Sequence, residues 1–533
     1  MTRPIPEADE RTAVLLVHAP YPGRLKFEGL PSSLLHAIGP FAASGAADDL
    51  GASLGFLDPG TPSPAFYARL GELAAGGRLR AVCISTSTAA IEETARIVRV
   101  IRDVAGDEVL VVVGGPHEDD CEEKVGVRLA GVDLSIGGDA EYVLEFALRE
   151  HLERDATAEA TCRRLQRELS GGGSIFAGSG TVTSPWWEGA RTRTFSFRGA
   201  ADDSPLPATI EKNVSFPVFR ARRTLPVMIS RGCAYGRCTF CAEGTRGEGQ
   251  LVRQDFAWLE ARLEQASETA LYFQDSIFPN NAAVRERLLP MLRAWGGEWG
   301  CQVYLRALSR QFLGLLAAHG CTYVYTGLET ASADILAAVG KTNMNREVAL
   351  ERFGWMRAEG LRAGISLMFG SMSTAGTLLE TEETIDETVA LAQVIAGSSL
   401  QVIGFYPNVQ TVLPGTALAR GLAAAGHELD FYRVPRCEVF DGLEDGGVGY
   451  NFMTIPTVRA AGKERIAERI AAAGAAVQRL GTDRWDPTAG VVCERRPRWG
   501  SRHLDAQPTR RRSASNAWAM LLAGAAGPIR SSA

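Results

Sequence analysis

The run Ser230-Arg231-Gly232-Cys233-Ala234-Tyr235-Gly236-Arg237-Cys238-Thr239-Phe240-Cys241 places three cysteines within nine residues. Thiolates this close together can hold one iron–sulfur cluster or a zinc ion. A structural zinc site needs four ligands, and Cys301 or Cys321 could supply the fourth only through the fold. Three thiolates on a cubane cluster leave one iron free to bind another molecule. The spacing C-x4-C-x2-C without a nearby fourth cysteine therefore favours an iron–sulfur cluster.

The residues that follow the cysteines alternate between apolar runs and helical stretches, the pattern of parallel strands joined by helices. The predicted strands are residues 226–230, 270–273, 302–305, 323–326, 363–369 and 401–405. The predicted helices between them include residues 258–266, 283–295, 311–319 and 347–359. Six strand–helix units, with no clear seventh or eighth, predict a partial (β/α)6 barrel over residues 223–420. Its catalytic site should lie at the carboxyl ends of the strands.

Polar residues or glycine follow five consecutive predicted strands. The first strand leads into the cysteines, and the next four are followed by Gln274-Asp275-Ser276, Arg306, Gly327-Leu328-Glu329-Thr330 and Gly370. Any one of them could be an ordinary surface residue, and for Arg306 that interpretation is as good as the functional one. Because parallel barrel strands present their ends to one shared mouth, we expect the five to converge there.

Residues 12–152 predict a second α/β unit, in which apolar strands alternate with helices as in a doubly wound, Rossmann-like sheet. Three predicted strands end in small or hydroxylated residues, and ligands of open α/β sheets bind beyond such ends. The candidate binding residues are Ser85, Thr86, Gly114, Gly115, Gly138 and Glu141. No G-x-G-x-x-G follows the first strand, which argues against a dinucleotide. The alternative is that these glycines serve ordinary turns.

Taken in order, the motifs resemble those of the cobalamin-dependent radical S-adenosylmethionine (SAM) enzymes, in which a cobalamin-binding domain precedes the barrel. Besides the cysteine run, the matching segments are Cys83-Ile84-Ser85-Thr86, Gly114-Gly115-Pro116-His117, Gly138-Asp139-Ala140-Glu141, Gly327-Leu328-Glu329-Thr330, Gly340-Lys341-Thr342 and Pro414-Gly415-Thr416. This chain departs from the family in three places. It has one extra residue in the first cysteine gap, Asp139-Ala140 in place of Glu-Gly, and Ser371-Met372-Ser373 in place of G-x-P-G-E-T. The resemblance covers about residues 12–420.

The resemblance implies three cofactors: a [4Fe–4S] cluster, SAM and cobalamin. The implied cluster ligands are Cys233, Cys238 and Cys241, and the implied SAM contacts are Phe240, Gln274, Arg306 and Glu329. Cobalamin would bind at the strand ends of the first unit, through the six candidate residues named above. The D-x-H-x-x-G signature of domains that ligate cobalt through histidine is absent. Cobalamin would therefore bind with its own base displaced and without His18 or His117 on cobalt.

The implied activity is methylation of an unactivated carbon in a natural-product or peptide substrate. In the family's mechanism, cleavage of SAM gives a 5′-deoxyadenosyl radical that abstracts hydrogen from that carbon, and methylcobalamin then donates the methyl group. A one-electron donor such as flavodoxin or ferredoxin would reduce the cluster. One alternative is a radical SAM cyclase or rearrangement enzyme with the same cofactors. Another is a non-catalytic cobalamin- or metal-binding sensor, against which the polar strand ends argue.

Composition further narrows the class of protein. The 533 residues carry a net charge of −6, which gives no case for nucleic-acid binding, and ten scattered cysteines, which show no disulfide framework. The N-terminus has no apolar signal segment, and no apolar run reaches the roughly 18 residues that span a membrane. We therefore expect a cytoplasmic enzyme without membrane contact, with the following regions. They are a cobalamin-binding domain (residues 1–152), a linker with weak hairpin-like alternation (153–222), the barrel (223–420), a helical substrate cap (421–493) and a disordered tail (494–533).

Overall fold

The computed structural model describes most of the first 492 residues. The described ranges are 5–20, 37–38, 41–42, 46–57, 62–170, 178–189, 191–197, 218–219, 223–244, 250–252, 256–263, 269–444, 446–458, 460–481, 485–486 and 491–492. By their internal contacts, residues 1–493 form one compact unit and residues 494–533 a second. The tail expected to be disordered, residues 494–533, lies outside the described residues. Among the helices that are described, none combines the length and the apolar character needed to cross a bilayer.

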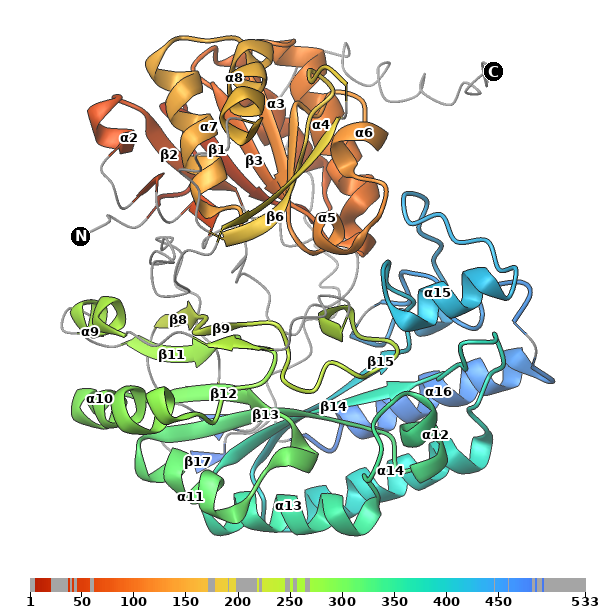
Figure 1. Cartoon of the computed structure of the whole chain (residues 1–533). Helices are drawn as coiled ribbons and strands as arrows, with labels where there is room; N and C mark the ends of the chain where they lie inside the picture. Colours follow the sequence, from red (N-terminus) through yellow and green to blue (C-terminus); the bar gives the residue numbers. More distant parts are fainter. Residues whose placement is uncertain are drawn as a thin grey trace, which may run out of the picture. The chain divides into compact units, whose positions relative to one another are not determined.

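The first sheet has seven strands in the order β2-β1-β3-β4-β5-β6-β7 (Figure 1). They are β1 (Thr12–His18), β2 (Ser53–Leu57), β3 (Ala81–Ser85), β4 (Leu110–Gly114), β5 (Leu134–Gly138), β6 (Gly178–Thr183) and β7 (Thr192–Phe197). The first five strands are parallel, and β6 and β7 add an antiparallel hairpin to the edge of β5. The predicted Rossmann-like unit is thereby confirmed. Strand β2 was not predicted, because its five residues include a glycine and give a weak apolar signal.

Helices cover both faces of this sheet. One face packs on α3 (Pro64–Ala75) and α4 (Ile91–Ala105), and the other on α7 (Glu141–Glu153) and α8 (Ala158–Ser170). Successive side chains of a strand point to opposite faces, so Leu15 and Val17 of β1 join the core with α3 and α4, while Val14 and Leu16 join the core with α7 and α8. Burial on both faces explains why these strands are continuously apolar. Short helices complete the unit: α2 (Ala46–Asp49), η1 (Thr88–Ala90), α5 (Pro116–Asp120) and α6 (Val125–Arg128).

Part of the expected linker, residues 153–222, belongs to this first unit. Helix α8 packs on the sheet, and the β6–β7 hairpin extends it. Trp187 follows β6, is buried, and donates a hydrogen bond from Nε1 to the Cys162 carbonyl of α8 at 2.8 Å. The weak alternation of the sequence indicated hairpin strands. It could not indicate where they dock, because their partner β5 lies about 40 residues earlier in the chain.

The second sheet consists of six parallel strands in the order β15-β14-β13-β12-β11-β8. They are β8 (Arg223–Val227), β11 (Thr269–Phe273), β12 (Trp299–Val303), β13 (Cys321–Glu329), β14 (Arg362–Phe369) and β15 (Val402–Val409). The two terminal strands of this order do not pair with each other, so the partial barrel is open, as predicted from six units. Strand β12 (Trp299–Val303) ends before the predicted residue 305, so Arg306 lies in the following turn η5 (Leu305–Ala307) rather than at the strand end.

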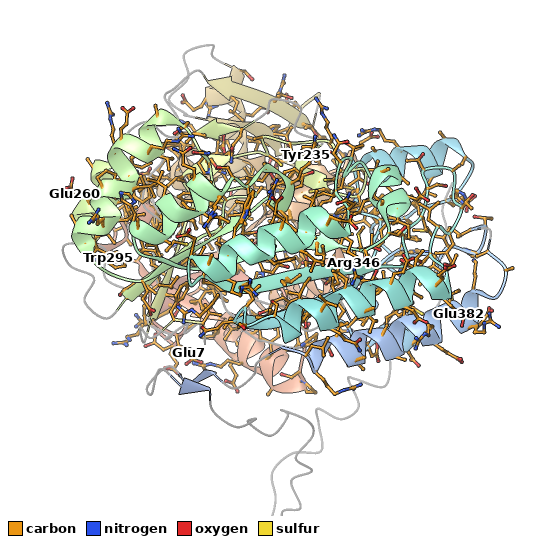
Figure 2. All side chains as sticks on the ribbon, turned by 90° about the horizontal axis from the view of Figure 1, so that it is seen from below. Glu7, Tyr235, Glu260, Trp295, Arg346 and Glu382 are labelled. Carbon is orange, nitrogen blue, oxygen red and sulfur yellow. The ribbon has the colours of Figure 1, made fainter. Side chains whose placement is uncertain are left out.

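Helices pack on the outer face of this sheet, and Figures 1 and 2 show α13 and α14 side by side along it. In Figure 2, Arg346 and Glu382 mark the first turns of these two helices. The helical elements are α9 (Ala257–Leu263), the π-helical turn η4 (Val284–Leu288), α10 (Leu289–Trp295), α11 (Arg310–Ala318), α12 (Ala333–Ala338), α13 (Arg346–Ala358), α14 (Glu382–Gly397) and α15 (Ala417–Ala424). Their apolar side chains form the largest core of the molecule with the strands they cover.

The region after α15 is mostly irregular and ends in one long helix. Helix α16 (Lys463–Gln478) packs against α14 and β15, with Ile466 and Ile470 buried in the barrel core. Residues 421–493 were expected to form a substrate cap. Helix α16, which lies in this region, is instead part of the outer layer of the barrel. The remaining short elements are η6 (Glu438–Phe440), β16 (Trp485–Asp486) and β17 (Val491–Val492).

Candidate functional site

The three predicted cluster cysteines lie on one loop after the first barrel strand. The loop leaves β9 (Ser230–Arg231), which pairs with β10 (Leu251–Val252), and ends at the turn η3 (Ala242–Gly244). All three thiols are free and half-buried. Gly236 has φ +58°, in the region that favours glycine, and its N–H donates to Cys233 Sγ at 3.5 Å. This turn lies between Cys233 and Cys238, in the first cysteine gap.

Asp275, at the end of β11, fixes the start of the cysteine loop. Its Oδ1 accepts hydrogen bonds from Ile229 N at 3.1 Å, Ser230 N at 2.5 Å and Ser230 Oγ at 2.5 Å. Its Oδ2 is buried and has no hydrogen-bond partner in the described part of the chain. Burial raises the pKa of this carboxyl to about 7, against the three hydrogen bonds, which lower it. Asp275 was not among the predicted site residues.

The middle of the cysteine loop docks on the turn that follows α12. Thr239 N donates to the Val339 carbonyl at 3.0 Å, and the Tyr235 hydroxyl donates to the Gly340 carbonyl. Gly340 has φ +85°, and a Cβ there would overlap the Arg237 carbonyl oxygen. The close approach of the two backbones therefore requires glycine at this position.

A buried ion pair lies beside the second cysteine. Lys341 Nζ donates to Glu329 Oε1 at 2.6 Å and to the Gly327 carbonyl at 3.3 Å, with both side chains about one-tenth exposed. Burial raises the pKa of the Cys238 thiol to about 12, and the Lys341 ammonium opposes this rise. Glu329 adopts φ +66°, which is uncommon for a residue with a side chain. The predicted SAM residue Glu329 is thus already paired with a cation that acts on Cys238.

The other predicted SAM residues lie around the same loop and the neighbouring strand ends. Gln274 follows β11, and its buried Oε1 has no hydrogen-bond partner within the described ranges. Arg306 is half-exposed and has no carboxylate partner among the residues the structure describes. Phe240 is partly buried against Ile335, Val339 and Met368. That packing holds the loop between the last two cysteines against the barrel.

A cavity of about 250 Å³ lies beyond the carboxyl ends of β3, β4 and β5. Five of the six predicted cobalamin residues line it: Ser85, Gly114, Gly115, Gly138 and Glu141. The sixth, Thr86, does not. It is buried, and its hydroxyl accepts a hydrogen bond from Thr94 Oγ1 at 2.6 Å inside the sheet–helix packing. The lining residues also include Met228, Arg231 and Glu243, which flank the cysteines at the start of the barrel.

The backbone itself requires glycine at some positions of this cavity. Gly115 has φ +103°, and a Cβ there would lie 2.7 Å from the Thr86 carbonyl oxygen. A Cβ at Gly114 would lie 3.1 Å from the Ile136 carbonyl oxygen on the neighbouring strand. The alternative that these glycines serve the backbone is therefore sufficient for Gly115 even without a ligand.

His117, which could have been an axial ligand, does not line the cavity. It is fully buried, its Nδ1 hydrogen-bonds Thr88 Oγ1 at 3.1 Å, and its ring packs edge-on against Tyr432. Burial, with a contribution from Lys124, lowers the pKa of the imidazole to about 4. The imidazole is therefore neutral at pH 7, and its buried Nε2 has no hydrogen-bond partner within the described ranges.

Arg231 connects the cysteine loop to the cavity. Its Nη1 lies 2.9 Å from Asp139 Oδ1, and its Nη2 donates to Glu141 Oε1 at the first turn of α7. Burial acts to lower the pKa of Arg231, but the Glu141 and Asp139 carboxylates outweigh it and raise the pKa overall. We call Arg231, Asp139 and Glu141 the Arg231 cluster. Within the described ranges, no three His, Cys, Asp or Glu side chains are gathered into a ready metal-binding group.

Three site residues were missed: Asp275, Lys341 and Arg231. Asp275 stands next to Gln274, and Lys341 lies in the segment Gly340-Lys341-Thr342, so both were within quoted motifs but had no assigned role. Arg231 stands inside the cysteine run, yet its partners are about 90 residues earlier in the sequence. No local signal could have connected it to them.

The overall architecture, a Rossmann-like unit before an open six-stranded barrel, is similar to that of cobalamin-dependent radical SAM enzymes of known structure. TsrM of Kitasatospora setae, a radical SAM methyltransferase solved with cobalamin and a [4Fe–4S] cluster, is similar over 93% of both chains, at 17% identity and a TM-score of 0.55. Its complex with tryptophan substrate and a SAM analogue aligns with 77% of this chain and 76% of that chain, at 16% identity and a TM-score of 0.53. OxsB, a cobalamin-dependent SAM radical enzyme solved with aqua-cobalamin, aligns with 83% of this chain and 64% of its own, at 13% identity and a TM-score of 0.53.

At the level of sequence, an uncharacterised methyltransferase of Pyrococcus horikoshii is 22% identical over 354 residues, 63% of this chain and 68% of the relative. No protein-family model matches the chain. At these identities the similarity establishes the fold, and the fold agrees with the one that the sequence motifs implied.

Proposed function

We propose that this protein is a cobalamin-dependent radical SAM methyltransferase. The observation that carries the proposal is the cavity beyond β3, β4 and β5. Its wall includes five of the predicted cobalamin residues, and it also includes residues from the segments on either side of the cysteines. A ligand in this cavity would therefore contact the thiol loop. Ligands of open α/β sheets bind at this end of the strands, which is where the chain concentrates its glycines and hydroxyl groups.

The thiols of Cys233, Cys238 and Cys241 have the right chemistry to hold a [4Fe–4S] cluster. They are free, lie on one loop and influence one another electrostatically. Burial raises the pKa of the Cys241 thiol to about 11, so both it and Cys238 are protonated at neutral pH and must lose their protons when metal binds. When bound, the cluster would supply the electron that cleaves SAM, and cobalamin would carry the methyl group.

The SAM contacts of Arg306 and Gln274 are proposed from hydrogen-bonding groups that these side chains can still offer. Arg306, without a carboxylate partner in the described part of the chain, can form a charge-assisted hydrogen bond to the SAM carboxylate. Gln274 offers an unsatisfied acceptor for an N–H donor. We propose Phe240 as a contact to the adenine. Because Lys341 already pairs with Glu329, we propose that Glu329 accepts from SAM only alongside that lysine.

Cobalamin is proposed to enter the cavity with a part of its structure. About 250 Å³ is below the usual range for a drug-sized ligand, so the cavity suits a substituent of the corrinoid rather than the whole molecule. Ser85, Gly114, Gly115, Gly138 and Glu141 would line that part, and none of the histidines in the described ranges is among the lining residues. We propose on the family resemblance that cobalamin binds with its base displaced and without His18 or His117 on cobalt.

The substrate is proposed to be a small molecule or a peptide, methylated at carbon. The tryptophan complex of TsrM supports a small-molecule substrate. A one-electron donor such as flavodoxin or ferredoxin is proposed to reduce the cluster in a cytoplasmic setting. The ring-forming or rearranging alternative uses the same residues and differs only in the fate of the SAM methyl group.

Product analysis after anaerobic reconstitution tests the proposal. Chemically reduced protein loaded with iron, sulfide and cobalamin should convert SAM both to S-adenosylhomocysteine, from methyl transfer, and to 5′-deoxyadenosine. A rearrangement enzyme would give 5′-deoxyadenosine without S-adenosylhomocysteine, and a sensor would give neither. Replacing Cys233, Cys238 and Cys241 together by Ala should abolish the brown chromophore and the 5′-deoxyadenosine. If the wild-type protein retained zinc and no iron, the cluster assignment would be lost.

A further inference from the structure

We infer that Arg231 is a positioning residue that couples ligand binding in the cavity to the order of the cysteine loop. The inference rests on the proposed function in one respect: cobalamin is taken as the ligand of the cavity. It adds a link between two cofactor sites that lie in different structural units of the chain.

The geometry of Arg231 is set from both sides. Its backbone pairs with Leu251 across the β9–β10 ladder, and the preceding Ser230 is held by Asp275. Cys233 follows after a single residue, Gly232, whose φ is +78°. The side chain reaches away from the barrel to Asp139 and Glu141. A change in the Arg231 cluster therefore acts on the backbone immediately before the first cysteine.

The same cluster forms part of the cavity wall. Arg231 and Glu141 both line the cavity, and Gly138 N donates to Asp119 Oδ1 at 2.6 Å beside them. The Arg231 side chain is one-third exposed, and that of Glu141 is 6% exposed. A ligand that fills the cavity covers the part of Arg231 that lines it and removes water from that part. Attraction between Arg231 and its carboxylates strengthens as water is excluded, so the loop becomes more firmly held.

Because such coupling is reciprocal, ordering the cysteine loop should in turn favour binding of the ligand. Alternatively, a ligand could shield Cys233 directly by its bulk. The two cases differ at Arg231. Direct shielding persists when Arg231 is replaced, whereas coupling through the Arg231 cluster is lost.

The test measures alkylation of Cys233 in the cluster-free full-length protein, under anaerobic conditions, with iodoacetamide and peptide mass spectrometry. Saturating methylcobalamin should slow alkylation of Cys233 in the wild type by about 5-fold or more, the lower range of typical coupling. Absorbance titration should show that Arg231→Gln still binds methylcobalamin. The protection of Cys233 in this variant should fall to less than about 2-fold. The matched control is Arg237→Gln, an exposed arginine of the same loop, which should keep the full protection.

Asp139→Asn combined with Glu141→Gln tests the cluster from its other side, at a methylcobalamin concentration that absorbance titration shows to saturate the variant, because Glu141 also lines the cavity. It should reproduce the loss of protection with every residue of the cysteine loop unchanged, which keeps the inference testable if Arg231→Gln folds poorly. Protection that survives in both variants, or binding without any protection in the wild type, would overturn the coupling while leaving the proposed function intact. Wild-type protein that does not bind methylcobalamin would contradict the proposed function as well.

Discussion

At the scale of the residue, one buried carboxylate sets the position of the cysteine loop. Asp275 holds Ile229 and Ser230 through a single oxygen, while its second oxygen is buried without a hydrogen-bond partner in the described part. Burial therefore favours the protonated form, and the pKa rises from 3.8 to about 7. A carboxyl whose folded pKa is raised binds its proton more tightly in the folded state. Its contribution to stability is full at low pH and is lost as pH rises toward 7.

We predict that Asp275→Asn flattens the pH dependence of unfolding. Asparagine keeps the acceptor oxygen for the loop but cannot ionise, so stability relative to wild type should increase as pH rises from 5 to 7. The slope that one such group adds is up to ~1.4 kcal/mol per pH unit. Urea unfolding of the cluster-free protein at several pH values measures it. Glu118 and Glu380, whose pKa values burial also raises to about 7, leave a residual slope. A parallel offset at all pH values would contradict the assignment.

At the scale of the element, the cysteine loop depends on its contact with the turn after α12. We predict that Gly340→Ala displaces the loop, because the Cβ would overlap the Arg237 carbonyl and the backbone has φ +85°. The strain should cost about 1–3 kcal/mol and reduce iron incorporation on reconstitution. Gly354→Ala is the matched control: it lies inside α13 with no atom within 4 Å of the added Cβ. It should stabilise by about 1 kcal/mol and leave iron content unchanged.

The Lys341–Glu329 ion pair lies next to the contact between the cysteine loop and the turn after α12. We predict that mutations of these two residues have non-additive effects on stability. Lys341→Met leaves a buried carboxylate beside Cys238 without its cation, which should cost about 3–5 kcal/mol in unfolding free energy. Glu329→Gln combined with Lys341→Met removes both charges and should recover most of that loss. Thermal unfolding of the single variants and the double variant checks the cycle. Additive losses would mean that the two side chains do not act as a pair.

At the scale of the whole molecule, contacts between the C-terminal region and the first unit complete the arrangement. The Tyr432 hydroxyl donates to the Glu123 carbonyl, and Arg128 lies 3.6 Å from Asp430. These contacts and the Arg231 cluster both join the Rossmann-like unit to the rest of the chain. The Arg231 cluster does so through a residue before the three cysteines, and the other contacts through residues after them. Of these residues, Arg231 and Glu141 line the cavity beyond the carboxyl ends of β3, β4 and β5.

We predict that filling the cavity blocks cobalamin without disturbing the fold. Ala140 lines the cavity and precedes α7 with φ −82°, a conformation that any residue adopts. Ala140→Trp should therefore abolish binding of cobalamin in absorbance titrations while circular dichroism stays unchanged. Ala160→Trp, at an exposed position on α8, is the control and should bind normally. Equal binding by both variants would place cobalamin elsewhere.

The sequence alone determined the two α/β units, the open six-strand barrel and most of the strand ends, because burial on both faces makes parallel strands continuously apolar. It also located the three cysteines and five of the cavity residues, since these stand within short motifs. Tertiary structure alone decided which residues meet across long separations. The β6–β7 hairpin docks on β5, Arg231 reaches Asp139 and Glu141, and Lys341 neutralises Glu329 beside Cys238. Those contacts depend on charge pairing and backbone approach between distant segments, for which periodicity and local motifs carry no signal.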